Sequence, residues 1–214
     1  MAERQRDVFL CDDIEHVDHI MVSAFAADPS FAWTTPFDMP ERERWLLGFL
    51  HTWHMFIRRH GGFAVMDSSR ASAIITEPYH DPPLSDADVK RFHDEITQAT
   101  GPAAERFITF VELLEDKKPQ GLPPHIHWCL GGVLPDRYER GAIADIINWH
   151  KGYADALGLE HYLEASSLGA MERWSNAGFT RVGDPIQMPG GEVELYPMRT
   201  YRRSAPRPDT TRTS

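Results

Sequence analysis

The segment His125-Ile126-His127-Trp128-Cys129-Leu130-Gly131-Gly132-Val133-Leu134-Pro135 carries the strongest structural signal in the chain. Histidines alternate with apolar residues at its start, which predicts a strand over residues 125–133. Successive side chains of a strand point to opposite faces, so His125, His127 and Cys129 share one face. A helix over residues 138–157 and a second strand over residues 161–166 follow.

The same periodicity predicts the remaining elements. Further strands are expected at residues 8–11, 63–66, 71–76, 179–182 and 192–200, and further helices at residues 14–25, 41–60, 85–98, 103–116 and 168–177. This order predicts an α/β or α+β fold with a mixed sheet flanked by helices. We expect a single domain over residues 7–201, a flexible N-terminus over residues 1–6 and a disordered basic tail over residues 202–214.

Charge and composition exclude several classes of protein. The 214 residues include 22 Lys and Arg against 32 Asp and Glu, a net charge of −10 with neutral histidines. This balance argues against a nucleic-acid partner and against a basic membrane-binding face. No run of about 18 apolar residues occurs, and residues 1–7 lack the apolar core of a secretion signal. The only cysteines, Cys11 and Cys129, do not suggest a disulfide framework. We therefore expect a cytoplasmic protein without a membrane partner.

Common catalytic and metal motifs are missing from the sequence. It contains no G-x-x-x-x-G-K-[ST], no Cys-x-x-Cys, no H-E-x-x-H and no Ser-His-Asp signature. The face with His125, His127 and Cys129 offers metal-ligand atoms. No second ligand pair follows at a usual spacing, so we expect no metal.

Five short motifs in the C-terminal half occur in a meaningful order. They are His127-Trp128-Cys129-Leu130, Val133-Leu134-Pro135, Tyr162-Leu163-Glu164-Ala165-Ser166, Gly178-Phe179 and Tyr196-Pro197-Met198-Arg199. Together they resemble a bacterial and fungal branch of the GNAT acetyltransferase superfamily, and residues 24–31 resemble that branch's segment after its first helix. The element order agrees over about residues 7–201.

This resemblance implies a splayed mixed sheet with acetyl-CoA, or another acyl-CoA, between the fourth and fifth strands. Backbone amides that open a helix can bind a pyrophosphate. The resemblance places them at Arg140, Gly141, Ala142, Ile143 and Ala144, and it places the amide that polarises the acyl carbonyl near Val133. It also implies an amine acceptor and a tyrosine that protonates the leaving thiolate.

The sequence departs from the GNAT pattern on the side expected to hold the cofactor. Only Gly141 remains of the family's glycines in Q-G-x-G-x-G, with Glu139 and Ile143 at two of the other glycine positions. Two residues are missing between Leu130 and Pro135, where a bulge normally splays the strands. Trp174 replaces the tyrosine, and an indole is not a useful acid at neutral pH. These departures predict a divergent CoA site.

The candidate site residues lie in both halves of the chain. His127, with a pKa near neutrality, and Glu164, on the strand facing the cleft, are the candidate catalytic bases. Asp28, Trp33, His54, Trp128 and Trp174 are the candidate substrate-binding residues. Trp174 and Ile143 together would make the cofactor slot apolar.

Three functions are consistent with these residues. The first is acyl-CoA-dependent transfer to an amine of a small molecule. The second is a GNAT-fold enzyme without CoA that performs a proton-transfer, cyclisation or isomerisation step on a hydrophobic metabolite. The third is a non-catalytic ligand-binding module. In each the partner is a small molecule, and the oligomeric state stays open, a homodimer included.

Overall fold

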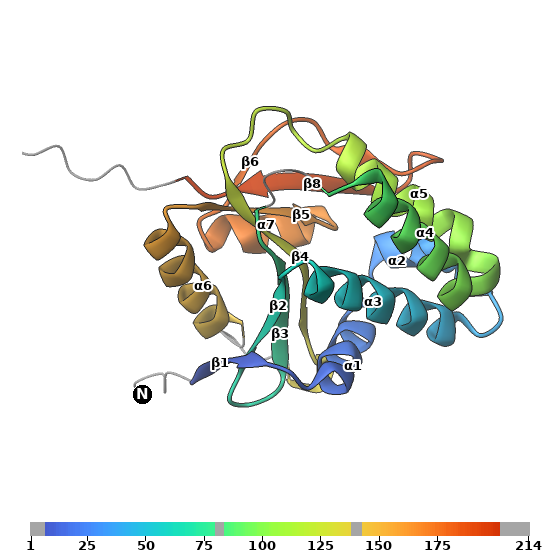
Figure 1. The fold of residues 1–214 in the computed structure, drawn as a ribbon, viewed down its shortest axis with the longest axis horizontal. Coiled ribbons are helices and arrows are strands. Elements are labelled where there is room, and N and C mark those ends of the chain that lie inside the picture. The colour runs from blue at the N-terminus through green and yellow to red at the C-terminus, as the bar shows by residue number, and fades with distance from the viewer. Residues whose placement is uncertain (1–6, 80–83, 138–142, 202–214) are drawn as a thin grey trace, which may run out of the picture.

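The computed structural model describes residues 7–79, 84–137 and 143–201 (Figure 1). The predicted flexible N-terminus and basic tail lie outside these residues. The strands are β1 (Val8–Cys11), β2 (Phe63–Asp67), β3 (Ser72–Glu77), β4 (His125–Val133), β5 (Glu160–Ala165), β6 (Thr180–Arg181), β7 (Ile186–Gln187) and β8 (Glu194–Arg199). The helices are α1 (Ile14–Phe25), α2 (Pro29–Thr34), α3 (Arg42–Arg59), α4 (Asp86–Thr100), α5 (Ala104–Asp116), α6 (Ala144–Leu157) and α7 (Leu168–Asn176).

The strands form one mixed sheet in the order β1-β2-β3-β4-β5-β8-β6, with β7 paired to β8. The pair β4 and β5 is parallel, whereas the others are antiparallel. The parallel pairing joins only His125–His127 to Glu160–Tyr162. Beyond it, β4 continues against β3, and β5 continues against β8. The predicted mixed, splayed sheet is therefore confirmed, and the splay begins directly after His127.

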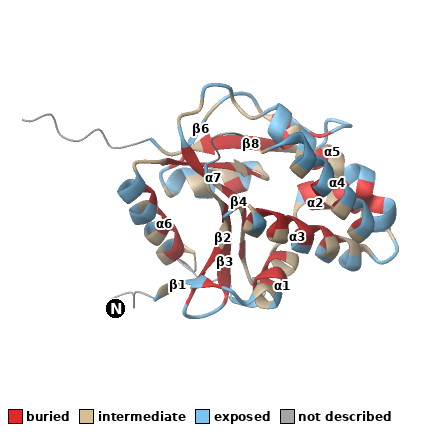
Figure 2. Ribbon diagram, viewed as in Figure 1, coloured by how far each residue is buried: buried red, intermediate tan, exposed pale blue. Residues whose placement is uncertain are grey.

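Helices cover both faces of the sheet and enclose two hydrophobic cores. Helices α1 to α5 gather on one side, and α6 and α7 lie on the other (Figure 1). The larger core contains Phe49, Phe107 and Leu130, and the smaller contains Trp128, Ile146 and Phe179. The buried stripe of α3 faces the sheet, and its outer surface is exposed (Figure 2). No helix in the described ranges has the length and apolar character needed to cross a bilayer.

A one-residue irregularity interrupts β4 at Cys129. Ile75 is paired with Leu130 and Thr76 with Trp128, so Cys129 is the extra residue. An inserted residue places two consecutive side chains on one face of a strand. Accordingly, Trp128 packs in the smaller core, whereas Cys129 and Leu130 pack on the larger one. The shortened segment between Leu130 and Pro135 has therefore not abolished either the irregularity or the splay.

Three details differ from the sequence-based expectation. Helix α2 was not expected, because Pro29 was taken to end α1; instead Asp28 caps a new helix and Pro29 occupies its first turn. The two-residue strand β7 is too short to give a periodic signal. Leu157 was expected to face inward but is 54% exposed, since it lies in the last turn of α6 beyond the sheet-facing stripe.

Candidate active site

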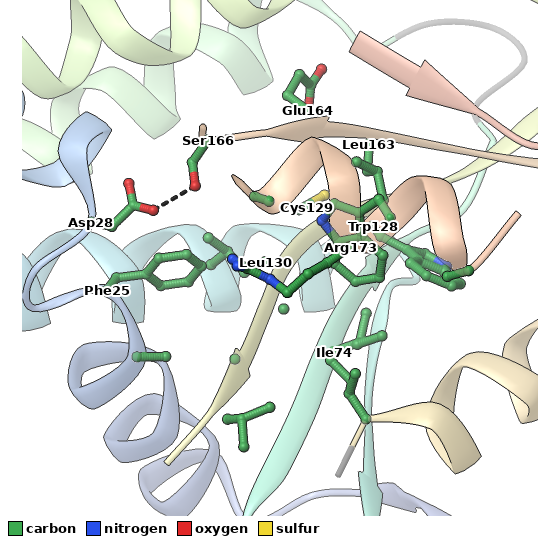
Figure 3. Close-up of a pocket in the computed structure, with 18 of the residues that line it drawn as sticks. Phe25, Asp28, Ile74, Trp128, Cys129, Leu130, Leu163, Glu164, Ser166 and Arg173 are labelled. Carbon is green, nitrogen blue, oxygen red and sulfur yellow. Dashed lines mark hydrogen bonds between the residues drawn. The ribbon is translucent and has the colours of Figure 1, made fainter. Parts of the chain in front are cut away.

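A cavity of about 1060 Å³ occupies the place where β4 and β5 separate. Residues 128–133 of β4 form one wall, and Leu163, Glu164 and Ser166, on and just after β5, form another (Figure 3). Its lining includes members of both hydrophobic cores. The cavity therefore connects the two sides of the sheet through the splay.

On the side of α1 to α5 the cavity is lined by aromatic and aliphatic side chains. We call this part the aromatic chamber, and its residues are Phe25, Phe31, Trp53, Phe110 and Leu114. Asp28 borders it and accepts hydrogen bonds from the Ser30 amide and from the Ser166 hydroxyl (Figure 3). The start of α2 is thus tied to the end of β5. The chamber offers apolar walls together with one carboxylate.

Glu164 and His127 form a hydrogen-bonded pair at the point where the strands separate. His127 Nε2 lies 2.9 Å from Glu164 Oε2, and only 5% of the Glu164 side chain is exposed. Burial alone would raise the pKa of Glu164, but His127 outweighs it and holds that pKa below its usual value. Burial would likewise lower the pKa of His127, yet Cys129 and Glu164 keep it well above its usual value. Glu164 is therefore an ionised carboxylate that lines the cavity.

Two further groups adjoin His127 on its other side. Glu77, at the end of β3, lies opposite His127 in the strand register. His127 Nδ1 is 3.6 Å from Glu77 Oε2, and Cys129 Sγ is 3.8 Å from the same oxygen. Burial raises the pKa of the Cys129 thiol. His127 thus lies between two carboxylates, with a thiol beside it.

On the side of α6 and α7 the cavity has a different lining. We call this part the α6–α7 groove, and its residues are Ile143, Ala144, Lys151, Arg173 and Trp174. Trp174 packs on Trp128 with ring centroids 5.7 Å apart, and both Ile143 and Trp174 contact the smaller core. The groove therefore combines an apolar wall with two cationic side chains.

The structure brings together seven of the predicted site residues around this cavity. They are Asp28, Trp128, Val133, Ile143, Ala144, Glu164 and Trp174. His127 is not part of the lining but is bonded to Glu164. Arg140, Gly141 and Ala142 lie outside the described residues.

Two predicted substrate-binding residues lie away from the lining. His54 is fully buried, and its Nδ1 is 2.8 Å from Asp18 Oδ1. Trp33 donates from its Nε1 to the carbonyl of Pro189. Both side chains are used in holding the helices and the loop before β8.

Sequence reasoning missed several residues of the site. Ser166 belongs to a recognised motif, but its bond to Asp28 joins positions 138 residues apart. Lys151 and Arg173 were indistinguishable from other surface cations. Glu77 had no local signal, because its neighbours in the site come from the adjacent strand. Only the sheet register identifies these residues.

Comparison with known proteins places this geometry among the acetyltransferase folds. No family model and no curated protein sequence matches the chain. Among solved structures, histone acetyltransferase HPA2 and related acetyltransferase from Corynebacterium glutamicum is similar, with a TM-score of 0.66 at 17% identity over 95% of this chain and 99% of that one. Arylalkylamine N-acetyltransferase 2 from Aedes aegypti gives 0.63 at 14% identity, covering 92% and 99%. A Drosophila melanogaster polyamine N-acetyltransferase gives 0.60 at 12% identity, covering 92% and 100%.

These likenesses extend over nearly the whole chain and over the whole of the similar proteins. The chain therefore has the fold of the GNAT N-acetyltransferases, and the resemblance drawn from the sequence motifs is confirmed at the level of the fold. Fold alone does not establish chemistry. The reaction has to be argued from the cavity itself.

Proposed function

We propose that this protein transfers an acyl group from acyl-CoA to the amine of a small molecule. The observation that carries the proposal is the buried carboxylate of Glu164, which lines the cavity where it passes through the splayed sheet. An amine in the aromatic chamber and a thioester in the α6–α7 groove would meet at this carboxylate. Structurally similar proteins that act on agmatine and on arylalkylamines support the choice of an amine acceptor.

The described residues of the groove suit an acyl-CoA. Lys151 and Arg173 are cations at the mouth, where a diphosphate would need countercharge. Gly131 turns its missing side chain toward Ile143 and Trp174, which leaves that stretch of wall open. Acyl-CoA would supply the activated acyl group. The adjacent helix α6 begins at Ala144, and its first amides point in the direction expected of an anion site.

The aromatic chamber suits an amine with an apolar body. Phe25, Phe31, Trp53 and Phe110 provide apolar area, and Asp28 provides a single anionic group for a cationic nitrogen. Asp28 is held in place by Ser166, so its position does not depend on the ligand. A monoamine with an aromatic or aliphatic body fits these walls better than a long polycation.

The reaction follows from these placements. The amine nitrogen forms a bond to the acyl carbon, the bond from that carbon to sulfur breaks, and the nitrogen's proton passes to Glu164. His127 donates from Nε2 to the same carboxylate and fixes its orientation. The thiolate leaves through the α6–α7 groove and is protonated by water, because Trp174 replaces the family's acid.

The proposal is tested by calorimetric titration of acetyl-CoA and of free CoA, followed by a thiol-release assay. The acceptors would be a neutral alcohol, an aromatic monoamine, an aliphatic monoamine and a diamine. We expect micromolar CoA binding and turnover of the monoamines. Absence of heat at millimolar CoA together with absence of thiol release would refute acyl transfer.

A CoA-independent reaction is the second candidate, and the apolar wall of the groove favours it. Ile143, Ile74 and Trp174 line a slot that a flat hydrophobic metabolite could fill. Glu164 would then move a proton within that metabolite. Binding of neutral aromatic compounds, competing with none of the CoA ligands, would favour this candidate over the first.

A further inference from the structure

Three metal-binding side chains converge beside the cavity, on two neighbouring strands. Ligand atoms of Glu77, His127 and Cys129 all lie within 4.8 Å of one another. The printed pairs are 3.6 Å for His127 Nδ1 to Glu77 Oε2 and 3.8 Å for Cys129 Sγ to the same oxygen. Around a tetrahedral zinc ion, adjacent nitrogen, oxygen and sulfur ligands lie roughly 3.3–3.6 Å apart, given the usual bond lengths. The three atoms need to move by only a few tenths of an ångström.

The backbone, rather than a chance arrangement of side chains, produces this convergence. Glu77 is the register partner of His127. The irregularity in β4 then inserts Cys129 and turns its side chain to the same face as that of Leu130. Without the extra residue, regular alternation would continue and the strand would carry the thiol farther along its axis. The bulge therefore contributes the third ligand.

Glu164 supplies a second, independent observation. It holds Nε2 of His127 at 2.9 Å, which leaves Nδ1 directed at Glu77. Metal-ligating histidines usually donate their other ring nitrogen to a carboxylate, which fixes the tautomer and orients the ring. His127 has this environment on one nitrogen and two further ligand types on the other.

We propose that Glu77, His127 and Cys129 bind a divalent zinc ion, with Glu164 as the carboxylate behind the histidine. Thiolate, imidazole and carboxylate together favour zinc over calcium or magnesium, which prefer oxygen ligands. Cys129 lines the cavity, so the ion borders it, and a fourth position remains for water or a ligand. The site is distinct from the acyl-transfer proposal and stands or falls separately from it.

The sequence argued against a metal because no second ligand pair follows the His-x-Cys of β4. The missing ligand comes from β3, 50 residues earlier in the chain, and only the register between the strands identifies it. The alternative arrangement has a proton in place of the ion at Nδ1, so that a charged imidazole lies between Glu77 and Glu164.

The test uses the full chain, reduced and stripped with a chelator, and Zn²⁺ alone as the probe. We expect calorimetry and elemental analysis to give one ion per chain. Co²⁺ in its place should give the near-ultraviolet thiolate charge-transfer band and the visible bands of tetrahedral cobalt. These spectra are recorded on the unmodified chain, so they do not depend on any variant folding.

Variants then locate the ion. Cys129→Ser should abolish the charge-transfer band, whereas Cys11→Ser, at the other cysteine, should keep it. His127→Gln and Glu77→Gln should weaken zinc binding at least 100-fold, and Glu164→Gln about 10- to 100-fold. The proposal is overturned if the chain binds no Zn²⁺ at micromolar concentration, if the band survives Cys129→Ser, or if nitrogen NMR finds both ring nitrogens of His127 protonated with Zn²⁺ present.

Discussion

The two sides of the splayed sheet meet in one cavity but hold their polar groups differently. On the side of α1 to α5, buried polar groups are paired: Asp18 bonds both His51 and His54, and Asp28 bonds Ser166. On the side of α6 and α7, His150 and His161 are buried among aromatic rings, and the cations Lys151 and Arg173 lie at the cavity mouth. The first side is a preorganised chamber, and the second is an apolar groove with charges at its entrance.

The largest effect is expected at Glu164, where the two sides meet. Glu164→Gln keeps the shape but removes the proton acceptor, so kcat for amine acylation should fall by about 100- to 10,000-fold. Acetyl-CoA affinity, measured by calorimetry, should stay within about threefold, because the groove is unchanged. Glu112→Gln, at a carboxylate 59% exposed on α5, is the matched control and should leave kcat intact. A Glu164→Gln enzyme with normal turnover would remove Glu164 from the chemistry.

The next effect separates the two sides by their response to acid. Burial lowers the pKa of His150 to about 3 and that of His161 to about 4, the second also through the charge of Lys151. The unfolded chain therefore binds more protons than the folded chain below the ordinary histidine value. Stability should be complete above about pH 6.5 and fall as the pH drops toward 4, by roughly 2–4 kcal/mol per histidine.

Urea unfolding at several pH values measures this dependence. His150→Gln should reduce the slope between pH 6.5 and 4, whereas His19→Gln, on the exposed surface of α1, should leave it unchanged. Hydrogen exchange should show α6 and α7 losing protection before α3. Equal loss on both sides of the sheet would contradict the contrast drawn here.

A third comparison uses the adjacent glycines of β4, which face opposite sides. A Cβ at Gly132 would lie 2.9 Å from Ala24 Cβ, so α1 would have to shift. A Cβ at Gly131 would find its nearest neighbour, in Ile74, at 3.6 Å, an ordinary contact. Gly132→Ala should therefore cost about 1–3 kcal/mol of unfolding free energy, and Gly131→Ala should cost none or add slightly to stability.

Binding should show the reverse order for this pair. Gly131→Ala places a methyl group in the groove wall beside Ile143 and Trp174, so acetyl-CoA affinity should fall severalfold in calorimetry. Gly132→Ala, where the protein stays folded, should bind acetyl-CoA nearly as well as the unmodified chain. If both variants behaved alike in stability and binding, β4 would not separate the two sides as described.

Local periodicity and the recognised motifs were sufficient to predict most of the fold. The long helix α3 and the strand β4 have regular patterns of apolar residues, and these elements formed as expected. Helix α2 was missed because Pro29 signals both the end of one helix and the first turn of the next. Short elements carry too few residues for a period to be recognised.

The site was less predictable than the fold, since it depends on contacts between distant segments. His127 and Glu164 were identified individually, but their bond depends on the parallel register of β4 and β5. His54 was a reasonable candidate on a helix near the pocket, yet its partner, Asp18, lies on α1 and holds it in the core. Pairings of this kind leave no trace in local spacing.

The smallest effect is expected at the mouth of the α6–α7 groove. Arg173 is solvent-exposed, so its charge is screened, and Arg173→Gln should raise the Kd for CoA by only about 3- to 10-fold, roughly 0.7–1.4 kcal/mol. The loss should shrink as salt rises. Pantetheine, which has no phosphate, should bind equally well to both proteins, and Arg91→Gln on α4 should leave CoA binding unchanged. An equal loss for pantetheine would mean that Arg173 supports the apolar wall through its alkyl chain rather than a phosphate, and the groove would then be apolar throughout.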